Sequence, residues 1–304
     1  MSPAAPPAEP PAAEDRPRVP AVPASSLVLV RPGAGGEISV FTVRRAGTMA
    51  FSAHATAFPG GRVDPADDLP DRLWEGTDLA DWGRRLGLPH EPVDAHGTLT
   101  ELDPAEGAGR VLAAAVRETF EETGVLLARD AVTGTPVDPA RVAAFPDELR
   151  DAVERHEVDF GELLDREGLR PDAGALVPWS RWITPHGGPR RYDTFFFAVH
   201  LPQGQSPERM SSEAASHGWA SPAELLRRFR AGKVNLMAPT WWQLRTLVDA
   251  GEDIHAGRSR FEPLEGVMLV AGQGPVFPHA DEYLRDLTAF RAAAQVEESK
   301  DNIL

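Results

Sequence analysis

The sequence predicts a protein of the α/β class, because strand-like apolar segments and amphipathic helical segments both occur along it. Strands are expected at 26–30 and 38–43, joined as a hairpin by a Pro/Gly turn. A third strand, at 194–199, is apolar enough for the centre of a sheet. The clearest helix is Val111–Thr123, whose apolar residues recur on one face at the helical period before Gly124 ends it.

Further elements are expected in the second half of the chain. One or two amphipathic helices are expected within 147–167, and strands at 179–182 and 191–201. A helix should begin at Ser221, which precedes a proline in the order typical of a helix N-terminus. Another helix is expected over 240–250.

The chain of 304 residues is long enough for one large domain or two small ones. Residues 1–24 contain eight prolines and no apolar run, so we expect a disordered Pro/Ala-rich tail rather than a targeting signal. One domain is expected over 25–250, and residues 251–304 are expected to be a C-terminal extension packing on it.

The charge and composition exclude several function classes. Lys and Arg number 31 against 46 Asp and Glu, a net charge of −15, which argues against nucleic acid or an anionic membrane as the main partner. The absence of cysteine excludes disulfides, thiolate metal sites and cysteine nucleophiles. No apolar run approaches the ~20 residues of a membrane span, and a cytoplasmic location is expected.

Three glutamates lie on the polar side of the predicted helix. Glu118, Glu121 and Glu122 fall within about 100° of arc, opposite the apolar face. Carboxylates this close repel one another by roughly a few tenths of a kcal/mol per pair, whereas Mg²⁺ takes oxygen ligands of this kind. The cluster therefore fits a cation site, and a solvated acidic helix face is the alternative for this pattern taken alone.

The surrounding residues resemble a known motif. Arg117 to Val125 reads R-E-T-F-E-E-T-G-V and resembles the second half of the Nudix box, R-E-U-x-E-E-x-G-U. Residues 58–67 resemble its first half, G-x5-E, with Asp67 at the position of the glutamate. Because an aspartate is shorter by one methylene, we expect Asp67 to reach the helix only through water.

The spacer between the two halves is unusually long, at 49 residues (68–116) instead of seven. Such an insertion is typical of the Nudix subfamily of peroxisomal coenzyme A diphosphatases and their bacterial relatives. Segments 179–185, 190–196 and 219–222 also look like this subfamily. The resemblance covers about residues 25–250.

The resemblance implies an α/β/α sandwich with a mixed central sheet, in which the box forms a loop–helix–loop. It also implies a small-molecule nucleotide substrate and Mg²⁺ or Mn²⁺ as cofactor, and it leaves a homodimer open. Carried over by position, Glu118, Glu121 and Glu122 are metal ligands. Arg117 would orient them through charge-assisted hydrogen bonds.

The resemblance also suggests a general base and the loop residues. Many Nudix enzymes take the base from a distal glutamate a few residues before a tryptophan, and Glu213 fits this pattern, with Glu118 as the alternative. Gly60 and Gly61 form the turn of the first half, and Gly61 would let that loop approach the helix closely.

The subfamily favours CoA or acyl-CoA, cleaved to 3′,5′-ADP and (acyl-)4′-phosphopantetheine. A pyrophosphatase of NADH or ADP-ribose and a non-catalytic ligand-sensing module are the alternatives, and the three intact box glutamates favour an enzyme. The 3′-phosphate of CoA requires basic contacts. Arg44, Arg45, Arg190 and Arg191 are the candidates, with an ordinary surface role as the alternative for each.

The insertion itself, 68–110, is acidic and rich in Pro and Gly. Apart from a short helix carrying Trp74 and Trp82, it is expected to form a surface excursion beside the substrate mouth. Replacing Leu69–Gly109 by a short linker would then preserve the fold.

Overall fold

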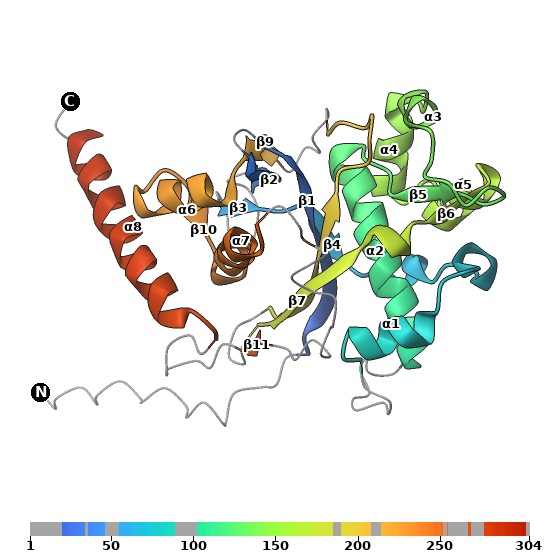
Figure 1. Cartoon of the computed structure of the whole chain (residues 1–304), viewed down its shortest axis with the longest axis horizontal. Coiled ribbons are helices and arrows are strands. Elements are labelled where there is room, and N and C mark those ends of the chain that lie inside the picture. The colour runs from blue at the N-terminus through green and yellow to red at the C-terminus, as the bar shows by residue number, and fades with distance from the viewer. Residues whose placement is uncertain are drawn as a thin grey trace, which may run out of the picture.

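The computed structural model describes residues 20–33, 36–45, 55–88, 102–184, 190–207, 214–251, 254, 267–268 and 277–301. A curled mixed sheet lies between two groups of helices, α1–α5 on one face and α6–α8 on the other (Figure 1). This arrangement confirms the predicted α/β/α sandwich. Its strands are β1 (Val22–Pro32), β2 (Ile38–Arg45), β3 (Ala55–Ala57), β4 (Gly60–Arg62), β7 (Val177–Ile183), β8 (Tyr192–His200), β9 (Ala214–Ala220), β10 (Asn235–Leu236) and β11 (Val267–Met268).

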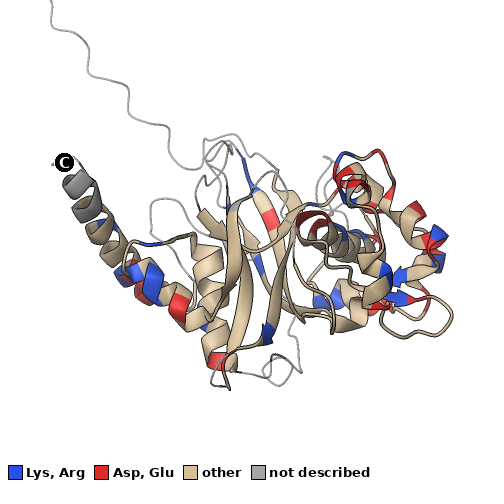
Figure 2. Cartoon of the chain, turned by 90° about the horizontal axis from the view of Figure 1, so that it is seen from above, with Lys and Arg blue, Asp and Glu red and all other residues tan. Residues whose placement is uncertain are grey.

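The helices on the α2 face are α1 (Leu79–Arg85), α2 (Pro104–Thr123), α3 (Pro139–Ala143), α4 (Asp147–Glu154) and α5 (Phe160–Arg166). A small antiparallel pair, β5 (Ala128–Asp130) and β6 (Leu169–Pro171), lies among them. The opposite face carries α6 (Pro222–Arg230), α7 (Ala238–Ala250) and α8 (Ala280–Asp301). Charged residues gather on the helices of the α2 side and are few on the strands, as expected for a sheet covered on both faces (Figure 2).

The described strands follow the order β10-β3-β2-β1-β8-β7-β11, with β4 also paired to β1 and β9 to β2. β1 and β2 form the predicted antiparallel hairpin. β1 pairs in parallel with β8, from Val22 opposite Tyr192 to Val30 opposite His200. This pairing brings the first and last thirds of the domain together at the sheet centre.

The alternation of side chains along these central strands divides the interior into two cores. On the α2 side, Leu27 of β1 and Phe197 of β8 are fully buried with the apolar face of α2. On the other side, Val28 and Phe196 pack with the aromatic residues of α6 and α7, including the fully buried Trp241. The sheet is therefore apolar on both faces.

Helix α8 packs on α6 and α7. The ring of Phe290 stacks on Phe229 of α6 with centroids 5.1 Å apart. The carboxylate of Asp286 accepts hydrogen bonds from Arg230 Nε at 2.6 Å and Trp241 Nε1 at 2.9 Å. Neither α8 nor any other described helix is both long and apolar enough to span a membrane.

The domain limits remain predictions, but the expected boundary between the N-terminal tail and the domain lies earlier in the chain. β1 begins at Val22, so residues 22–24 pair with β8 and β4 and do not belong to a tail. Residues 1–19 lie outside the described part of the chain.

The expected surface excursion is wrong for residues 69–88. Leu73, Trp74, Trp82, Leu86 and Leu88 are each at most 6% exposed and belong to the same core as α2. The stretch is acidic on average, and this average composition suggested an exposed segment although it contains these isolated apolar residues. A short helix carrying Trp74 and Trp82 was expected; Trp82 lies in α1, but Trp74 lies in a separate 3₁₀ turn at Asp71–Trp74. The burial of α1 against α2 was not expected.

Helix α2 also begins earlier than Val111. Asp103 caps it by accepting a hydrogen bond from the backbone N–H of Ala105 at 2.9 Å, and Pro104 occupies the first turn. A Cβ added at Gly83 of α1 would lie 2.7 Å from the carbonyl oxygen of Pro104, so the two helices touch closely. The first seven residues of α2 thus lie in the segment that was expected to be an insertion.

Candidate active site

The two halves of the predicted box meet across a loop–helix–loop. The first half runs through β4 into a 3₁₀ turn at Pro65–Asp67, and the second half is the C-terminal part of α2. Gly124 ends α2 in the left-handed region, at a φ of 76°, and donates its N–H to the carbonyl of Phe120 at 2.8 Å. The 49-residue spacer therefore leaves the loop–helix contact intact.

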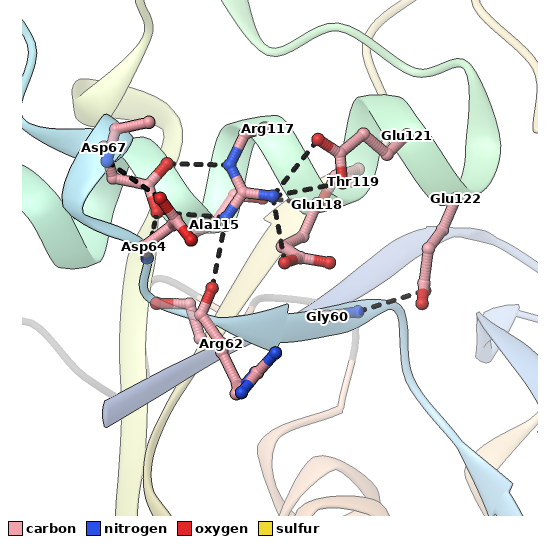
Figure 3. A network of polar contacts seen from close by, with 12 residues as sticks. Gly60, Arg62, Asp64, Asp67, Ala115, Arg117, Glu118, Thr119, Glu121 and Glu122 are labelled. Atoms are coloured by element: carbon pink, nitrogen blue, oxygen red, sulfur yellow. Dashed lines mark hydrogen bonds and ion pairs between the residues drawn. The ribbon is translucent and has the colours of Figure 1, made fainter. Parts of the chain in front are cut away.

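The side chain of Arg117 is the centre of this contact (Figure 3). It is 5% exposed, and all five of its N–H bonds have acceptors. Nε and Nη2 donate to the two carboxylate oxygens of Asp67 at 2.7 and 3.0 Å, and Nη2 also donates to the carbonyl of Arg62 at 3.1 Å. Nη1 donates to Glu118 at 3.0 Å and to Glu121 at 3.0 Å. One guanidinium thus fixes the loop and two of the three glutamates.

Asp67 contacts the helix directly, so the expectation of a water-mediated contact is wrong. It is 1% exposed, and its carboxylate also accepts the backbone N–H of Asp64 at 2.7 Å. Asp64 in turn caps the 3₁₀ turn by accepting from the N–H of Ala66. The turn brings the backbone of Asp67 close to α2, which compensates for the missing methylene.

The glycine pair allows the strand to lie against the glutamates. A Cβ at Gly61 would overlap the carboxylate of Glu118, and one at Gly60 would overlap the backbone of β1 at Ser25. Gly60 also donates its N–H to Glu122 at 3.1 Å. A side chain at Gly60 is therefore excluded by backbone, whereas one at Gly61 would displace the end of the Glu118 side chain, in line with the close approach expected for Gly61.

Negative charge exceeds positive charge in this cluster. Three carboxylates, those of Asp67, Glu118 and Glu121, pair with the single guanidinium of Arg117, and Glu122 lies on the same helix face (Figure 3). Burial is the main cause that raises the pKa of Glu118 to about 7; Arg117 opposes this shift and the charge of Glu121 adds to it. Burial likewise raises the pKa values of Glu121 and Asp67. An added cation would relieve this imbalance.

The donor set fits a hard divalent cation in its chemistry, because all of its ligand atoms are carboxylate oxygens. The side chains do not converge as a ready-made site, however. Glu118 and Glu121 face Arg117, whereas Glu122 turns toward Gly60 (Figure 3). Within the described ranges, no group of three acidic or histidine side chains stands in metal-binding geometry.

The three glutamates line a cleft of ≈ 460 Å³. Its other walls come from β1, β3, β4 and β8 and from the turn between β10 and α7. The cleft therefore reaches from the acidic face of α2 to the first turn of α7.

Several polar residues that were not predicted as site residues also line the cleft, among them Arg62, Glu154 and His156. Arg62 follows Gly61 in the box, and that adjacency was the available signal. Glu154 and His156 come from the end of α4, in a segment without any motif. Burial is the main cause of the raised pKa of Glu121, and the charge of Glu154 adds to that shift. His156 is held in the left-handed region, at a φ of 55°, beside this end of the cleft.

Three of the four predicted substrate arginines lie outside the cleft. Arg44 is exposed on β2, Arg190 is exposed, and Arg191 is buried with its Nε donating to the carbonyl of Thr184 at 2.8 Å. None of these three is among the residues that line the cleft. The side chain of Arg45 and the whole of Glu213 lie outside the described residues. Their assignment as substrate contacts, and of Glu213 as base, remains a prediction.

The sequence matches the family model of the NUDT19 Nudix domain over residues 21–247. The acyl-coenzyme A diphosphatase NUDT19 of Gallus gallus is 33% identical over 243 residues, covering 70% of this chain and 62% of that protein. The Homo sapiens protein of the same name is 28% identical over 305 residues, covering 90% and 80%. The matched region thus spans less than two thirds of the chicken relative.

A solved structure agrees with these matches. The Nudix hydrolase from Alicyclobacillus acidocaldarius is 30% identical, with a TM-score of 0.57 over 80% of this chain and 99% of that one. The fold, the Arg117-centred cluster and the match over most of the chain lead to one assignment. The chain belongs to the Nudix hydrolase family, in the group described by the NUDT19 Nudix domain.

Proposed function

We propose that this Nudix hydrolase cleaves the diphosphate of CoA or acyl-CoA, with Mg²⁺ or Mn²⁺, to 3′,5′-ADP and (acyl-)4′-phosphopantetheine. The observation that carries the proposal is the buried Arg117, which fixes Glu118 and Glu121 at one end of a substrate-sized cleft. The names of the chicken and human relatives support the choice of substrate.

Glu118 and Glu122 are the main candidates to hold the metal, because they lie one turn apart on the acidic face of α2 and both line the cleft. Glu121 is the third candidate, although both of its oxygens accept from Arg117. When bound, a divalent cation would neutralise charge on the diphosphate and lower the pKa of a water. The role of Arg117 is to hold the glutamates in place, because none of its N–H bonds is left for a substrate.

A carboxylate must accept the proton from the attacking water. Glu118 and Glu213 are the two candidates for this base. Glu118 lies in the cleft beside Gly61, where the missing Cβ leaves room for its carboxylate.

Two alternatives stand behind this proposal. A pyrophosphatase of NADH or ADP-ribose would use the same acidic end of the cleft with a different nucleotide. A ligand-sensing module would not need the acidic cluster, and the retention of Arg117 and all three box glutamates favours catalysis.

The test is turnover by the full chain with Mg²⁺ on CoA, acetyl-CoA, NADH and ADP-ribose, with products separated by chromatography. We expect CoA or acetyl-CoA to give the highest kcat/KM. Glu122→Gln should lower kcat at least ~100-fold, since a metal contributes several kcal/mol to the transition state. The matched control is Glu106→Gln, an exposed glutamate on the same helix, which should keep wild-type turnover.

Calorimetric titration with Mg²⁺ and Mn²⁺ provides a readout that does not depend on turnover. Glu122→Gln should weaken metal binding, and Glu106→Gln should not. Higher kcat/KM on NADH or ADP-ribose would replace the substrate while leaving the diphosphatase standing. Full activity of Glu122→Gln at saturating metal would refute the role given to the cluster.

A further inference from the structure

Helix α7 begins at the wall of the cleft without a side-chain cap. Met237 stands at the N-cap position, makes no capping hydrogen bond and is 40% exposed. Met237, Pro239 and Thr240 all line the cleft. The backbone N–H of Trp241 donates a hydrogen bond to the carbonyl of Met237 at 2.9 Å. The backbone N–H groups of Ala238 and Thr240 have no acceptor within the helix. The uncapped first turn of a 13-residue helix thus borders the substrate site.

Two largely buried threonines lie beside this first turn. Thr240 of α7 and Thr56 of β3 are each 6% exposed, and both line the cleft. β10 pairs with β3 so that Leu236, two residues before α7, is opposite Thr56; Figure 1 shows α7 close to these strands. Neither hydroxyl is hydrogen-bonded to the described part of the chain, and neither oxygen is among its fully enclosed side-chain atoms that lack a partner. Both hydroxyls are therefore open to the cleft and available to a polar ligand there.

Two arginines also line the cleft. Arg117 uses all five N–H bonds within the acidic cluster. Arg62 lies on β4, and its guanidinium is turned away from the box glutamates (Figure 3). An anionic group bound at the α7 wall would be attracted by the start of the helix, whose N-terminus carries about half a positive charge and directs N–H groups at an anion.

We propose that the first turn of α7, with the hydroxyls of Thr240 and Thr56, is a phosphate subsite that binds the 3′-phosphate of the nucleotide. The proposed function supplies the identity of the nucleotide, and the uncapped helix and the two hydroxyls supply the chemistry. The subsite accepts a phosphate monoester, whereas the diphosphate to be cleaved lies at the glutamate end. It gives the cleft a means of distinguishing 3′,5′-ADP from 5′-AMP.

The experiment measures the Kd values of 3′,5′-ADP and 5′-AMP by calorimetry on the full chain, with EDTA present to keep the acidic cluster free of metal. Wild type should bind 3′,5′-ADP about tenfold or more tightly, the size expected for hydrogen bonds to a charged group. Thr240→Val removes the hydroxyl at nearly constant volume, and it should reduce this ratio several-fold while leaving the Kd of 5′-AMP unchanged. Thr288→Val on the exposed side of α8 is the matched control, with an unchanged ratio.

A second variant separates binding from folding. Met237→Asp supplies the cap that α7 lacks and should maintain or raise Tm. The same carboxylate occupies the amides and repels the phosphate, so the preference for 3′,5′-ADP should disappear. If this turn has only a structural role, Met237→Asp should leave the preference for 3′,5′-ADP over 5′-AMP unchanged.

Equal binding of the two nucleotides by wild type would overturn the subsite, and so would variants that weaken both nucleotides alike. These outcomes are distinct from failure of the proposed function. CoA turnover without a preference for 3′,5′-ADP would remove the subsite and leave the enzyme assignment standing. A preference that Thr240→Val and Met237→Asp abolish, in a protein that does not cleave CoA, would support the subsite and remove CoA as the substrate.

Discussion

Residues 69–88 should be indispensable for folding, because they supply apolar side chains to the same core as α2. Replacing Leu69–Gly109 by a short linker would remove six large buried side chains, namely Leu69, Leu73, Trp74, Trp82, Leu86 and Leu88. At roughly 1.5–3 kcal/mol for each buried side chain, the loss is about 9–18 kcal/mol. A whole domain is stable by only about 5–15 kcal/mol. The truncation also removes the first six residues of α2, so we expect the shortened chain not to fold.

Single substitutions make the same argument measurable. Leu86 is fully buried, and Leu86→Ala should lower the free energy of unfolding by about 2–5 kcal/mol. Arg84, on the same helix, has a side chain that is 56% exposed, and Arg84→Ala should change stability by less than about 0.5 kcal/mol. Urea unfolding followed by circular dichroism gives both values, provided that the slope with denaturant stays constant. The reasoning fails if the shortened chain unfolds cooperatively at the wild-type midpoint, or if Leu86→Ala and Arg84→Ala are equally stable.

Three further predictions concern the site and the C-terminal helix. Gly61→Ala should lower kcat at least ~10-fold with little change in Tm, because its methyl group displaces the carboxylate of Glu118; unchanged kinetics would contradict the close approach. Arg117→Lys should lower the free energy of unfolding by about 3 kcal/mol, since an ammonium cannot reproduce the two-pronged pairing with buried Asp67; wild-type stability in urea would count against the central role of the guanidinium. Asp286→Ala should cost about 1–3 kcal/mol through its lost bonds to α6 and α7 but leave kcat unchanged; a drop in kcat at full stability would link α8 to catalysis.

The parts of the fold that the sequence predicted have strong local signals. The hairpin of β1 and β2, the central strand β8 and the later turns of α2 each show a clear apolar period or run. The pairing of Arg117 with the box glutamates was implied by the resemblance to the Nudix box. These features depend on residues that are near one another in the chain.

The parts that were missed depend on tertiary contact. Trp82 and Leu86 are separate apolar residues in an acidic stretch, and only the position of α1 against α2 reveals their burial. Thr56 and Thr240 line one cleft, and the parallel pairing of β3 with β10, which places Leu236 opposite Thr56, is not encoded in any local pattern. Glu154 reaches the cleft from α4, whose helical pattern was visible although its packing was not. Sequence spacing cannot supply such distances, because they are set by how the layers pack.

The division of the interior by the sheet has a consequence for how the protein opens. Each core can unfold locally without the other, and local unfolding exposes its backbone amides to exchange with solvent. Amide hydrogen exchange should therefore show two cooperative units, one with α2 and α1 and one with α6, α7 and α8. A molecule bound in the cleft touches α2 and the start of α7 together. It would therefore slow exchange in both units, including amides far from the cleft, because opening either unit would require its release.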